Sequence, residues 1–218
     1  MVAITRRGHR EQMSDRNLRS ERREQRRALS RDQILDVAEQ VFARKGFHDA
    51  SLREIAELAE YSVGSVYSFF DSKDDIYRDI FHRRGAEFLP QMRRILSSEQ
   101  PPRQQLLELA DWQVGFFRLH PHFGRLVLRG GAIAPPLAEP SGDPRLVENF
   151  QQSQRLQADL FERGQRTGEL RAGPPLALAR MFSGLISAYQ TAELEDAHEP
   201  MSKSEFHALL QDAFVVSA

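Results

Sequence analysis

Apolar residues recur every three or four positions along most of this 218-residue chain. This is the spacing of helices that bury one face, and no stretch alternates as a half-buried strand does. The first clear stripe is Ile34, Leu35, Ala38, Val41 and Phe42. Ser30, three residues ahead of Gln33, can cap the start of that helix, and Gly46 suits a left-handed residue at its end. The pattern therefore predicts a first helix over residues 30–45.

Residues 51–70 predict two short helices joined by a tight turn. Ser51, three residues ahead of Glu54, can cap the first helix. Its apolar stripe is Leu52, Ile55, Ala56 and Ala59. Ser62 can cap the second helix, in which Val66 and Phe70 stack at i, i+4 spacing toward the first, with Val63 alongside.

The other side of this second helix has an unusual composition: Gly64, Ser65, Ser68 and, at the flank, Tyr67. Glycine lets a helix backbone approach a DNA groove closely, and hydroxyls can bond to base edges or phosphate oxygens. A merely solvated helix more usually carries Glu, Lys and Arg there. This side is therefore a candidate DNA-reading surface.

A third helix is predicted to start after Ser72, which can cap it together with Asp75. Lys73 then lies in the first turn, where a cation is unfavourable by itself. The placement indicates an anion such as a DNA phosphate bound at that helix start. The alternative is a lysine that faces solvent in a connecting turn.

Residues 31–77, about a fifth of the chain, resemble the DNA-binding region of TetR-family transcriptional regulators. The resemblance rests on Ile34, Ala38, Phe42, Gly46, Phe47, Ser51, Leu52, Ile55, Ala56, Ser62, Gly64, Val66, Tyr67, Phe70, Ser72, Lys73 and Ile76. It implies contacts with DNA from Ser51, the segment 64–69 and Lys73, with Tyr67 and Lys73 on phosphates. The full set of expected DNA-contacting residues is Ser51, Ser62, Val63, Gly64, Ser65, Tyr67, Ser68, Phe69 and Lys73.

The chain departs from the family pattern at four positions in this region. Glu60 stands where the family often has glycine, and Val63 where a lysine commonly follows the capping serine. Ser68 and Phe69 replace a frequent histidine and tyrosine. These changes remove positive potential and usual phosphate or base partners, so the operator sequence does not carry over from the family.

Charge is distributed unevenly over the N-terminal part. Residues 31–77 carry a net charge of −5, whereas residues 1–30, rich in arginine, carry +5. The basic segment lacks apolar periodicity, so it is expected to be a disordered arm that strengthens binding by neutralising phosphates or entering the minor groove. The alternative is a solvated tail of no consequence. Its composition fits neither a secretory signal nor a transit peptide.

Beyond residue 73 the pattern predicts helices over 74–97, 103–119, 121–132, 144–168, 174–195 and 202–216, with a proline-rich loop at 134–144. The helix at 174–195 is apolar around nearly its whole circumference, and the last one carries Phe206, Leu209, Leu210, Ala213 and Phe214 on one face. These two helices are expected to form a homodimer interface, as the resemblance also implies. The alternative is an intramolecular core.

The resemblance further implies a cavity for a small-molecule effector among the C-terminal helices. Large side chains that could line it are Trp112, Phe116, Phe117, Phe123, Leu126, Met181, Phe182 and Tyr189. Such a lining has few polar groups and predicts a hydrophobic ligand. Aromatic residues at helical spacing are also common in packed cores.

Composition narrows the function further. The chain is 40% hydrophobic and 28% charged, an ordinary composition for a soluble protein. It has no cysteine, which excludes disulfides and thiolate chemistry and suits a cytoplasmic protein. No phosphate loop, nucleophile elbow or membrane span is evident. His120 and His122 lack a recognisable metal spacing, so no metal and no cofactor are expected.

Together these observations predict an all-α protein with three parts: a basic arm over 1–29, a helix-turn-helix DNA-binding domain over 30–77, and a larger helical ligand-binding and dimerisation domain over 78–218. The expected function is a dimeric repressor that binds a pseudo-palindromic double-stranded DNA operator and is released by a small molecule. A ligand-independent activator or architectural DNA binder is the alternative, and a helical enzyme is disfavoured because no catalytic constellation is present.

Overall fold

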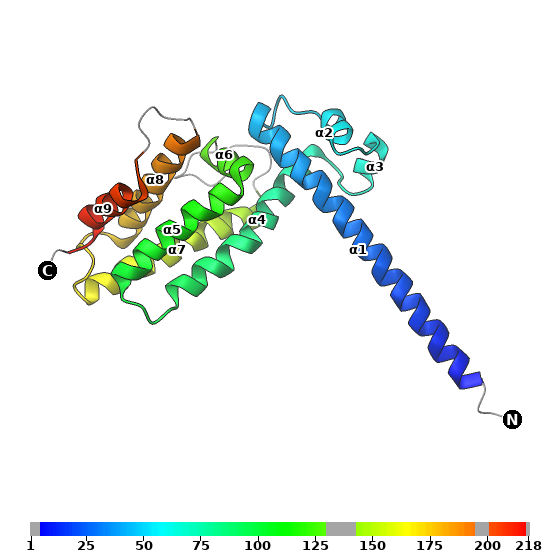
Figure 1. The fold of residues 1–218 in the computed structure, drawn as a ribbon, viewed down its shortest axis with the longest axis horizontal. Helices are drawn as coiled ribbons and strands as arrows, with labels where there is room; N and C mark the ends of the chain where they lie inside the picture. The colour runs from blue at the N-terminus through cyan, green and yellow to red at the C-terminus, as the bar shows by residue number, and fades with distance from the viewer. Residues whose placement is uncertain (1–4, 130–142, 195–200, 217–218) are drawn as a thin grey trace.

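The computed structural model describes residues 5–129, 143–194 and 201–216, with side chains from residue 21 onward. Within these residues the fold is helical, and its only β feature is the isolated bridge between Leu170 and Val215. The helices are α1 (Thr5–Lys45), α2 (Leu52–Leu58), α3 (Val63–Tyr67), α4 (Lys73–Leu96), α5 (Pro102–Leu119), α6 (Pro121–Arg129), α7 (Pro144–Arg166), α8 (Pro175–Leu194) and α9 (Lys203–Phe214). The predicted all-α class is confirmed (Figure 1).

The first helix begins much earlier than predicted. Ser30 does not cap it, because α1 runs without a break from Thr5 to Lys45 and extends well beyond α2 and α3 (Figure 1). Arginine, glutamate and glutamine are good helix formers, and a segment that joins an existing helix needs propagation but no new nucleus. The basic segment is therefore a helical extension in this structure, where a disordered arm was expected.

The other predicted helix boundaries agree with the structure to within two residues where they fall on described residues. The predicted ends at residues 132 and 195 lie outside those residues. The local signals behind them are present as hydrogen bonds: Ser51, Ser62, Ser72 and Ser202 each accept one from a backbone N–H three residues on. Gly46 has the expected left-handed conformation, with φ of 87°. The predicted loop at 134–144 lies outside the described residues up to position 142.

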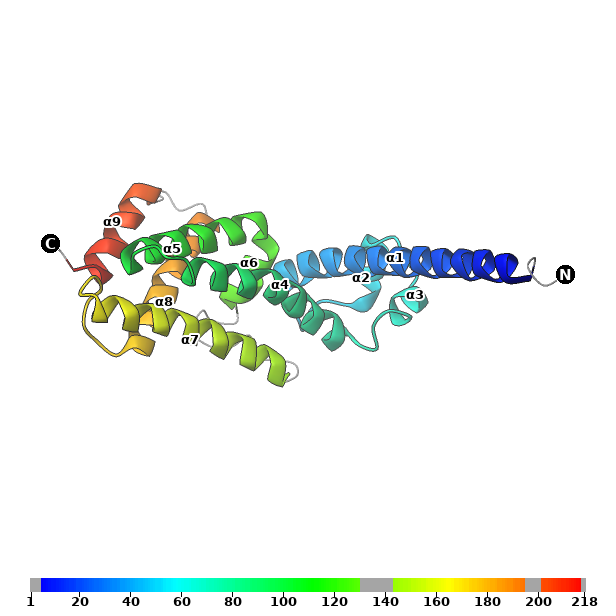
Figure 2. The same ribbon diagram turned by 90° about the horizontal axis from the view of Figure 1, so that it is seen from below.

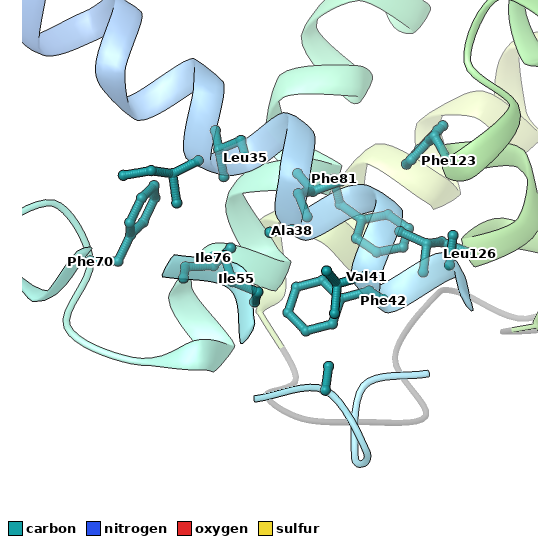
Figure 3. Packing of buried hydrophobic residues seen from close by; sticks show 14 of the residues in the cluster. Leu35, Ala38, Val41, Phe42, Ile55, Phe70, Ile76, Phe81, Phe123 and Leu126 are labelled. Carbon is teal, nitrogen blue, oxygen red and sulfur yellow. The ribbon is translucent and has the colours of Figure 1, made fainter. Parts of the chain in front are cut away.

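The N-terminal helices share one hydrophobic core. Leu35, Ala38 and Phe42 of α1 lie against Ile55 of α2 and Ile76 of α4, all at most 1% exposed (Figure 3). The same cluster continues through Phe81 into Phe123 and Leu126 of α6. Three short helices bury little surface by themselves, so α6 completes the core that holds the first domain to the rest of the chain.

A second core lies in the bundle of α4, α5, α7, α8 and α9. Its largest fully buried side chains include Phe161, Phe182 and Phe214, which pack as a group of rings. Helix α4 belongs to both cores: Ile76 and Ile80 are buried in the first, and Met92 and Ile95 in the second. Figure 2 shows α4 leading from beside α1 into the bundle, so it connects the two parts mechanically.

Candidate functional site

Helix α3 has one buried and one exposed face, as predicted. Val66 is 1% exposed and Phe70 4%, and both lie in the N-terminal core. On the other side Ser62, Gly64, Tyr67 and Ser68 are exposed, while Ser65 is half-buried. Val63, expected beside the buried pair, is 37% exposed because it lies in the first turn, before the helix packs on the core. The buried pair fixes the helix to α1 and α2, so the exposed face is presented on a rigid support.

The fold itself gives no reason for glycine at position 64. Its φ is not left-handed, and a Cβ atom placed there would lie 3.9 Å from Ser62 Oγ, an ordinary van der Waals distance. Alanine would favour the helix more than glycine does. Glycine at this place leaves the exposed side of α3 without a side chain, so that another molecule could approach the helix backbone closely there.

The hydroxyl groups around Gly64 hold the helix end together. Ser62 Oγ accepts a hydrogen bond from the Ser65 N–H at 3.0 Å and lies 2.8 Å from Ser65 Oγ, while Ser68 Oγ donates to the Ser65 carbonyl at 2.7 Å. Each oxygen keeps acceptor capacity for an outside donor. Tyr67 is 53% exposed, and its hydroxyl has no protein partner within the described part of the chain.

Phe69 is placed differently from the prediction. Its ring is half-buried, packs edge-on against Tyr61 at 6.4 Å, and lies under the Arg27 guanidinium at 5.6 Å. Arg27 also donates to the Ser68 carbonyl at 2.9 Å, where a cation is favoured at the C-terminus of α3. Phe69 therefore joins the basic extension of α1 to α3.

Lys73 also has a role other than the predicted phosphate contact. Its ammonium donates to the carbonyls of Phe47, His48 and Ala50 at 2.7, 3.2 and 2.9 Å, and it lies 4.4 Å from the centre of the Phe47 ring. Three acceptors match the three N–H donors of an ammonium. Lys73 thus fastens the turn between α1 and α2 to the start of α4.

Two acidic residues near α3 have specific structural positions. Glu60 has a φ of 61°, the left-handed conformation that explains why glycine is common at this place in the family. The Glu54 carboxylate does not complete the predicted capping box, because it pairs with Arg44 at 2.7 Å and Lys45 at 2.8 Å. These contacts lower the pKa of Glu54, with the Lys45 hydrogen bond as the largest cause.

A cavity of about 160 Å³ lies among α4 to α8, on the side of α4 that faces α7 and α8. Helices α4 and α7 supply most of its wall, and α5, α6 and α8 close it. The lining residues are Phe81, Arg84, Gly85, Phe88, Leu89, Gln113, Phe117, Phe123, Val127, Leu146, Asn149, Phe150, Ser153, Gln154, Gln157, Ser183, Ile186, Ser187 and Gln190.

Of the eight residues predicted to line an effector cavity, Phe117 and Phe123 do so. Trp112 and Phe116 stack behind Phe88, Leu126 lies in the N-terminal core, and Phe182 in the second core. Met181 is 60% exposed on the outer side of α8, and Tyr189 stacks on Phe206 at 4.2 Å. Helical spacing placed these side chains on buried faces but could not tell a packed face from a hollow one.

The predicted lining missed the polar half of the cavity. Gln154 and Gln157 lie on the apolar stripe of α7 that also carries Leu146, Leu160 and Phe161, and both are at most 6% exposed. Ser183 Oγ donates to Gln157 Oε1 at 2.9 Å and accepts from Gln154 Nε2 at 3.4 Å. Glutamines within an apolar stripe were the sequence signal for this wall, because buried amides need partners.

Arg84 connects the cavity with the DNA-binding part. Its guanidinium pairs with Glu39 of α1 at 3.0 Å and with Glu87 at 3.3 Å. The Glu39 side chain is 5% exposed and also pairs with Arg83 at 3.3 Å. A buried carboxylate on α1 is therefore held by two arginines of α4, one of which lines the cavity.

The described residues contain no group of His, Cys, Asp or Glu side chains that could hold a metal ion. His120 instead pairs with Glu87 at 3.4 Å and packs on Phe116. Burial, followed by the Arg84 charge, lowers the pKa of His120. Within the same part of the chain, none of the helices combines the length and apolarity needed to cross a bilayer.

Helices α2 and α3 form a helix-turn-helix of the kind found in DNA-binding proteins, and a larger helical domain follows it. Residues 34–80 match the family described as "Bacterial regulatory proteins, tetR family". These residues are therefore a TetR-type DNA-binding region, and the curated relatives that match them are named as regulators.

Curated relatives match the N-terminal part. The fatty acid metabolism regulator protein of Bacillus subtilis is 28% identical over 74 residues, which are 34% of this chain and 38% of that protein. The HTH-type transcriptional repressor NicS of Pseudomonas putida is 28% identical over 94 residues, 43% of this chain and 44% of that protein. The match thus spans less than half the length of these relatives.

Solved structures extend the likeness to the whole fold. The transcriptional regulator FadR of Bacillus subtilis, solved in complex with stearoyl-CoA, has a TM-score of 0.65 at 20% identity and covers 82% of this chain and 96% of its own. At that identity the comparison shows the fold: an N-terminal helix-turn-helix domain followed by a helical domain.

Proposed function

We propose that the protein is a homodimeric repressor that reads a pseudo-palindromic operator with α3 and is released by a small molecule bound in the α4–α8 cavity. The observation that carries the DNA-reading role is the exposed, nearly neutral face around Gly64, on a helix whose other face is locked into the core. Of the residues predicted to contact DNA, Ser51, Ser62, Val63, Gly64, Ser65, Tyr67 and Ser68 remain in the proposal. We also propose a cytoplasmic location, where operator DNA is accessible.

The basic extension of α1 supports the same role. Residues 21–29 are exposed, and Arg27 contacts the C-terminal end of α3. Arginines carried on a helix beside the reading surface can neutralise phosphates of the same duplex, which offsets the net charge of −5 over residues 31–77. Operator affinity would then fall steeply with salt.

For the dimer, α8 provides the main surface. It buries Ala179, Phe182 and Ile186 inside its own chain, yet leaves Met181 60% exposed and Gly184 facing open space. Leu209 of α9 is 39% exposed. Two copies related by a two-fold axis through these helices would present two α3 helices, about 34 Å apart for adjacent major grooves.

Arg84 and Glu39 offer a route from the cavity to DNA. A ligand that moves the Arg84 side chain also disturbs the buried pair that holds α4 on α1, and so changes the spacing of the two reading helices. Release then is a population shift toward a conformer with weaker operator affinity. Arg84→Met should bind ligand but lose most of the ligand-dependent change in operator affinity, whereas Glu87→Gln should keep it.

The DNA-reading proposal is tested with genomic fragments recovered by the purified protein. Gly64→Ala should raise the free energy of unfolding by up to about 1 kcal/mol and weaken binding to those fragments by about tenfold or more. Gly115→Ala is the matched control, because Gly115 is a helical, exposed glycine of α5 with open space at its Cβ. It should stabilise without changing DNA affinity. Equal DNA affinity of both variants would refute the reading role of α3.

The dimer proposal is tested by light scattering on Met181→Arg. A charge in the proposed interface should give a folded monomer, while Leu29→Arg, at a residue 64% exposed on α1, should remain dimeric. A Met181→Arg protein that stays dimeric at low micromolar concentration contradicts the α8 interface.

A further inference from the structure

Two amide atoms in the cavity wall have no hydrogen-bond partner in the described structure: Gln113 Nε2, a donor, and Gln154 Oε1, an acceptor. Both residues line the cavity, and they are 5% and 6% exposed. A buried polar atom without a partner is unfavourable, and native proteins leave few of them. A ligand that supplies an acceptor and a donor here would satisfy both atoms.

The orientation of the acceptor is fixed by its neighbours. Gln154 Nε2 donates to Ser183 Oγ at 3.4 Å, and Ser183 in turn donates to Gln157 at 2.9 Å. This chain of donors leaves the Gln154 carbonyl as the end that lacks a partner. Gln157 is bonded to Ser183 and Ser153, and Gln190 donates to the Gln113 backbone carbonyl at 3.5 Å. The buried side-chain atoms of the wall that lack a partner are therefore on Gln113 and Gln154.

The described residues give the cavity no unpaired charge. Among them Arg84 is the only charged residue of the lining, and its guanidinium is already paired with Glu39 and Glu87. An anionic ligand would have to compete with a buried carboxylate for it. A cationic ligand would find no carboxylate and would lie near an arginine. Both signs of charge are therefore disfavoured relative to a neutral molecule.

Size and shape limit the ligand further. A volume of about 160 Å³ is close to that of an engineered cavity of about 150 Å³ that binds benzene. The apolar part of the wall is largely aromatic, with Phe81, Phe88, Phe117, Phe123 and Phe150. Flat rings pack well against such side chains.

We infer that the cavity takes a small uncharged molecule with one ring and an amide-like group that both accepts and donates hydrogen bonds, the ring against the phenylalanines and the polar group between Gln113 and Gln154. This inference rests on the proposed effector function and names its ligand class. It differs from a long acyl-coenzyme A, which is larger and whose phosphates make it strongly anionic.

The test uses four probes of one shape with the full-length protein: benzamide, benzoate, benzylamine and toluene. Benzamide should raise the melting temperature most, because a ligand of the native state stabilises it. Calorimetric titration should show each of the other three binding at least about tenfold more weakly. Benzoate, benzylamine or toluene binding as tightly as benzamide, or no binding by any probe, overturns the inference.

Variants locate the effect. Gln113→Met and Gln154→Met, which keep side-chain length, should each remove most of the preference for benzamide over toluene. Gln151→Met is the matched control, since Gln151 is exposed on α7 one turn before Gln154, and it should keep the preference. A preference that persists in both cavity variants overturns the assignment. Operator binding is measured separately: selective benzamide binding without any change in operator affinity upholds the ligand class and refutes the effector function.

Discussion

Replacing Lys73 by methionine separates the phosphate-binding role that the sequence indicates from the fastening role that the structure gives it. Methionine keeps most of the aliphatic stem and removes the ammonium. In the structure this deletes three hydrogen bonds to the carbonyls at positions 47, 48 and 50 and the contact of a cation with the Phe47 ring. The turn between α1 and α2 then loses its tie to α4.

The expected loss of stability follows from these contacts. Hydrogen bonds from charged donors contribute about 1.5–3 kcal/mol each when well buried, and a cation over a ring about 0.5–2 kcal/mol. The Lys73 contacts are only partly buried, and water replaces some of them after unfolding. We therefore expect a decrease of about 2 kcal/mol in the free energy of unfolding, or roughly 4–8 °C in melting temperature for a chain of this size.

The assay combines thermal unfolding with operator affinity measured over a range of salt concentrations. A fastening lysine predicts a lower melting temperature and an unchanged slope of log affinity against log salt. A phosphate contact predicts a slope smaller by about 1.8 for the two lysines of a dimer, and little change in melting temperature. Lys203→Met, at a side chain 62% exposed beside Asp111, is the control and should change neither. A smaller slope with an unaltered melting temperature would refute the structural assignment.

Three further substitutions test other parts of the structure. Glu60→Gly should stabilise the protein by about 0.5–1 kcal/mol, because glycine adopts the left-handed conformation without strain. The control Glu57→Gly, inside α2, should destabilise it by about 1 kcal/mol. Urea midpoints of the two variants that move in the same direction would contradict the backbone argument. Glu39→Gln should destabilise the protein by about 2–3 kcal/mol, since it leaves buried guanidinium groups with fewer partners. The control Asp32→Asn, at a side chain 57% exposed, should change stability by no more than about 0.5 kcal/mol. Similar urea midpoints for the two variants would count against the buried pair. Burial lowers the pKa of His120 below its usual 6.5, so the unfolded chain binds the proton more readily and stability should fall as pH drops below about 6.5. His120→Asn should reduce that fall relative to the control His122→Asn. If the melting temperatures of the two variants change in parallel from pH 7.5 to 5, His120 plays no part.

Much of the fold could be predicted because its signals are local. A serine three residues before a backbone N–H caps a helix wherever the helix lies, and this holds at Ser51, Ser62, Ser72 and Ser202. The failure at Ser30 has a local reason as well. A capping pattern competes with continuation of the helix, and the residues before Ser30 are good helix formers, so continuation prevailed.

Features of the candidate site that depend on neighbouring residues in the sequence could be predicted, and those that depend on distant residues could not. The exposed and buried faces of α3 follow from its own periodicity, and they were predicted except at Val63, which was expected beside the buried pair and is 37% exposed. The contacts of the Lys73 ammonium could not be predicted, because its acceptors lie 23 to 26 residues earlier, in a turn whose position depends on the packing of α1 against α4. The contacts of Phe69 could not be predicted for the same reason, since the Arg27 that covers it comes from a part of α1 expected to be an arm.

The sequence alone determined the helical class, the order and limits of most helices, and the surface that α3 presents. These depend on spacings of one to four residues, which hydrogen-bond geometry fixes without knowledge of the neighbours. Tertiary structure decided which apolar faces are filled and which enclose a cavity, that Gln113 and Gln154 line the same cavity, and which carboxylate holds Arg84. These features join side chains from several helices, and their positions arise only when the helices pack together.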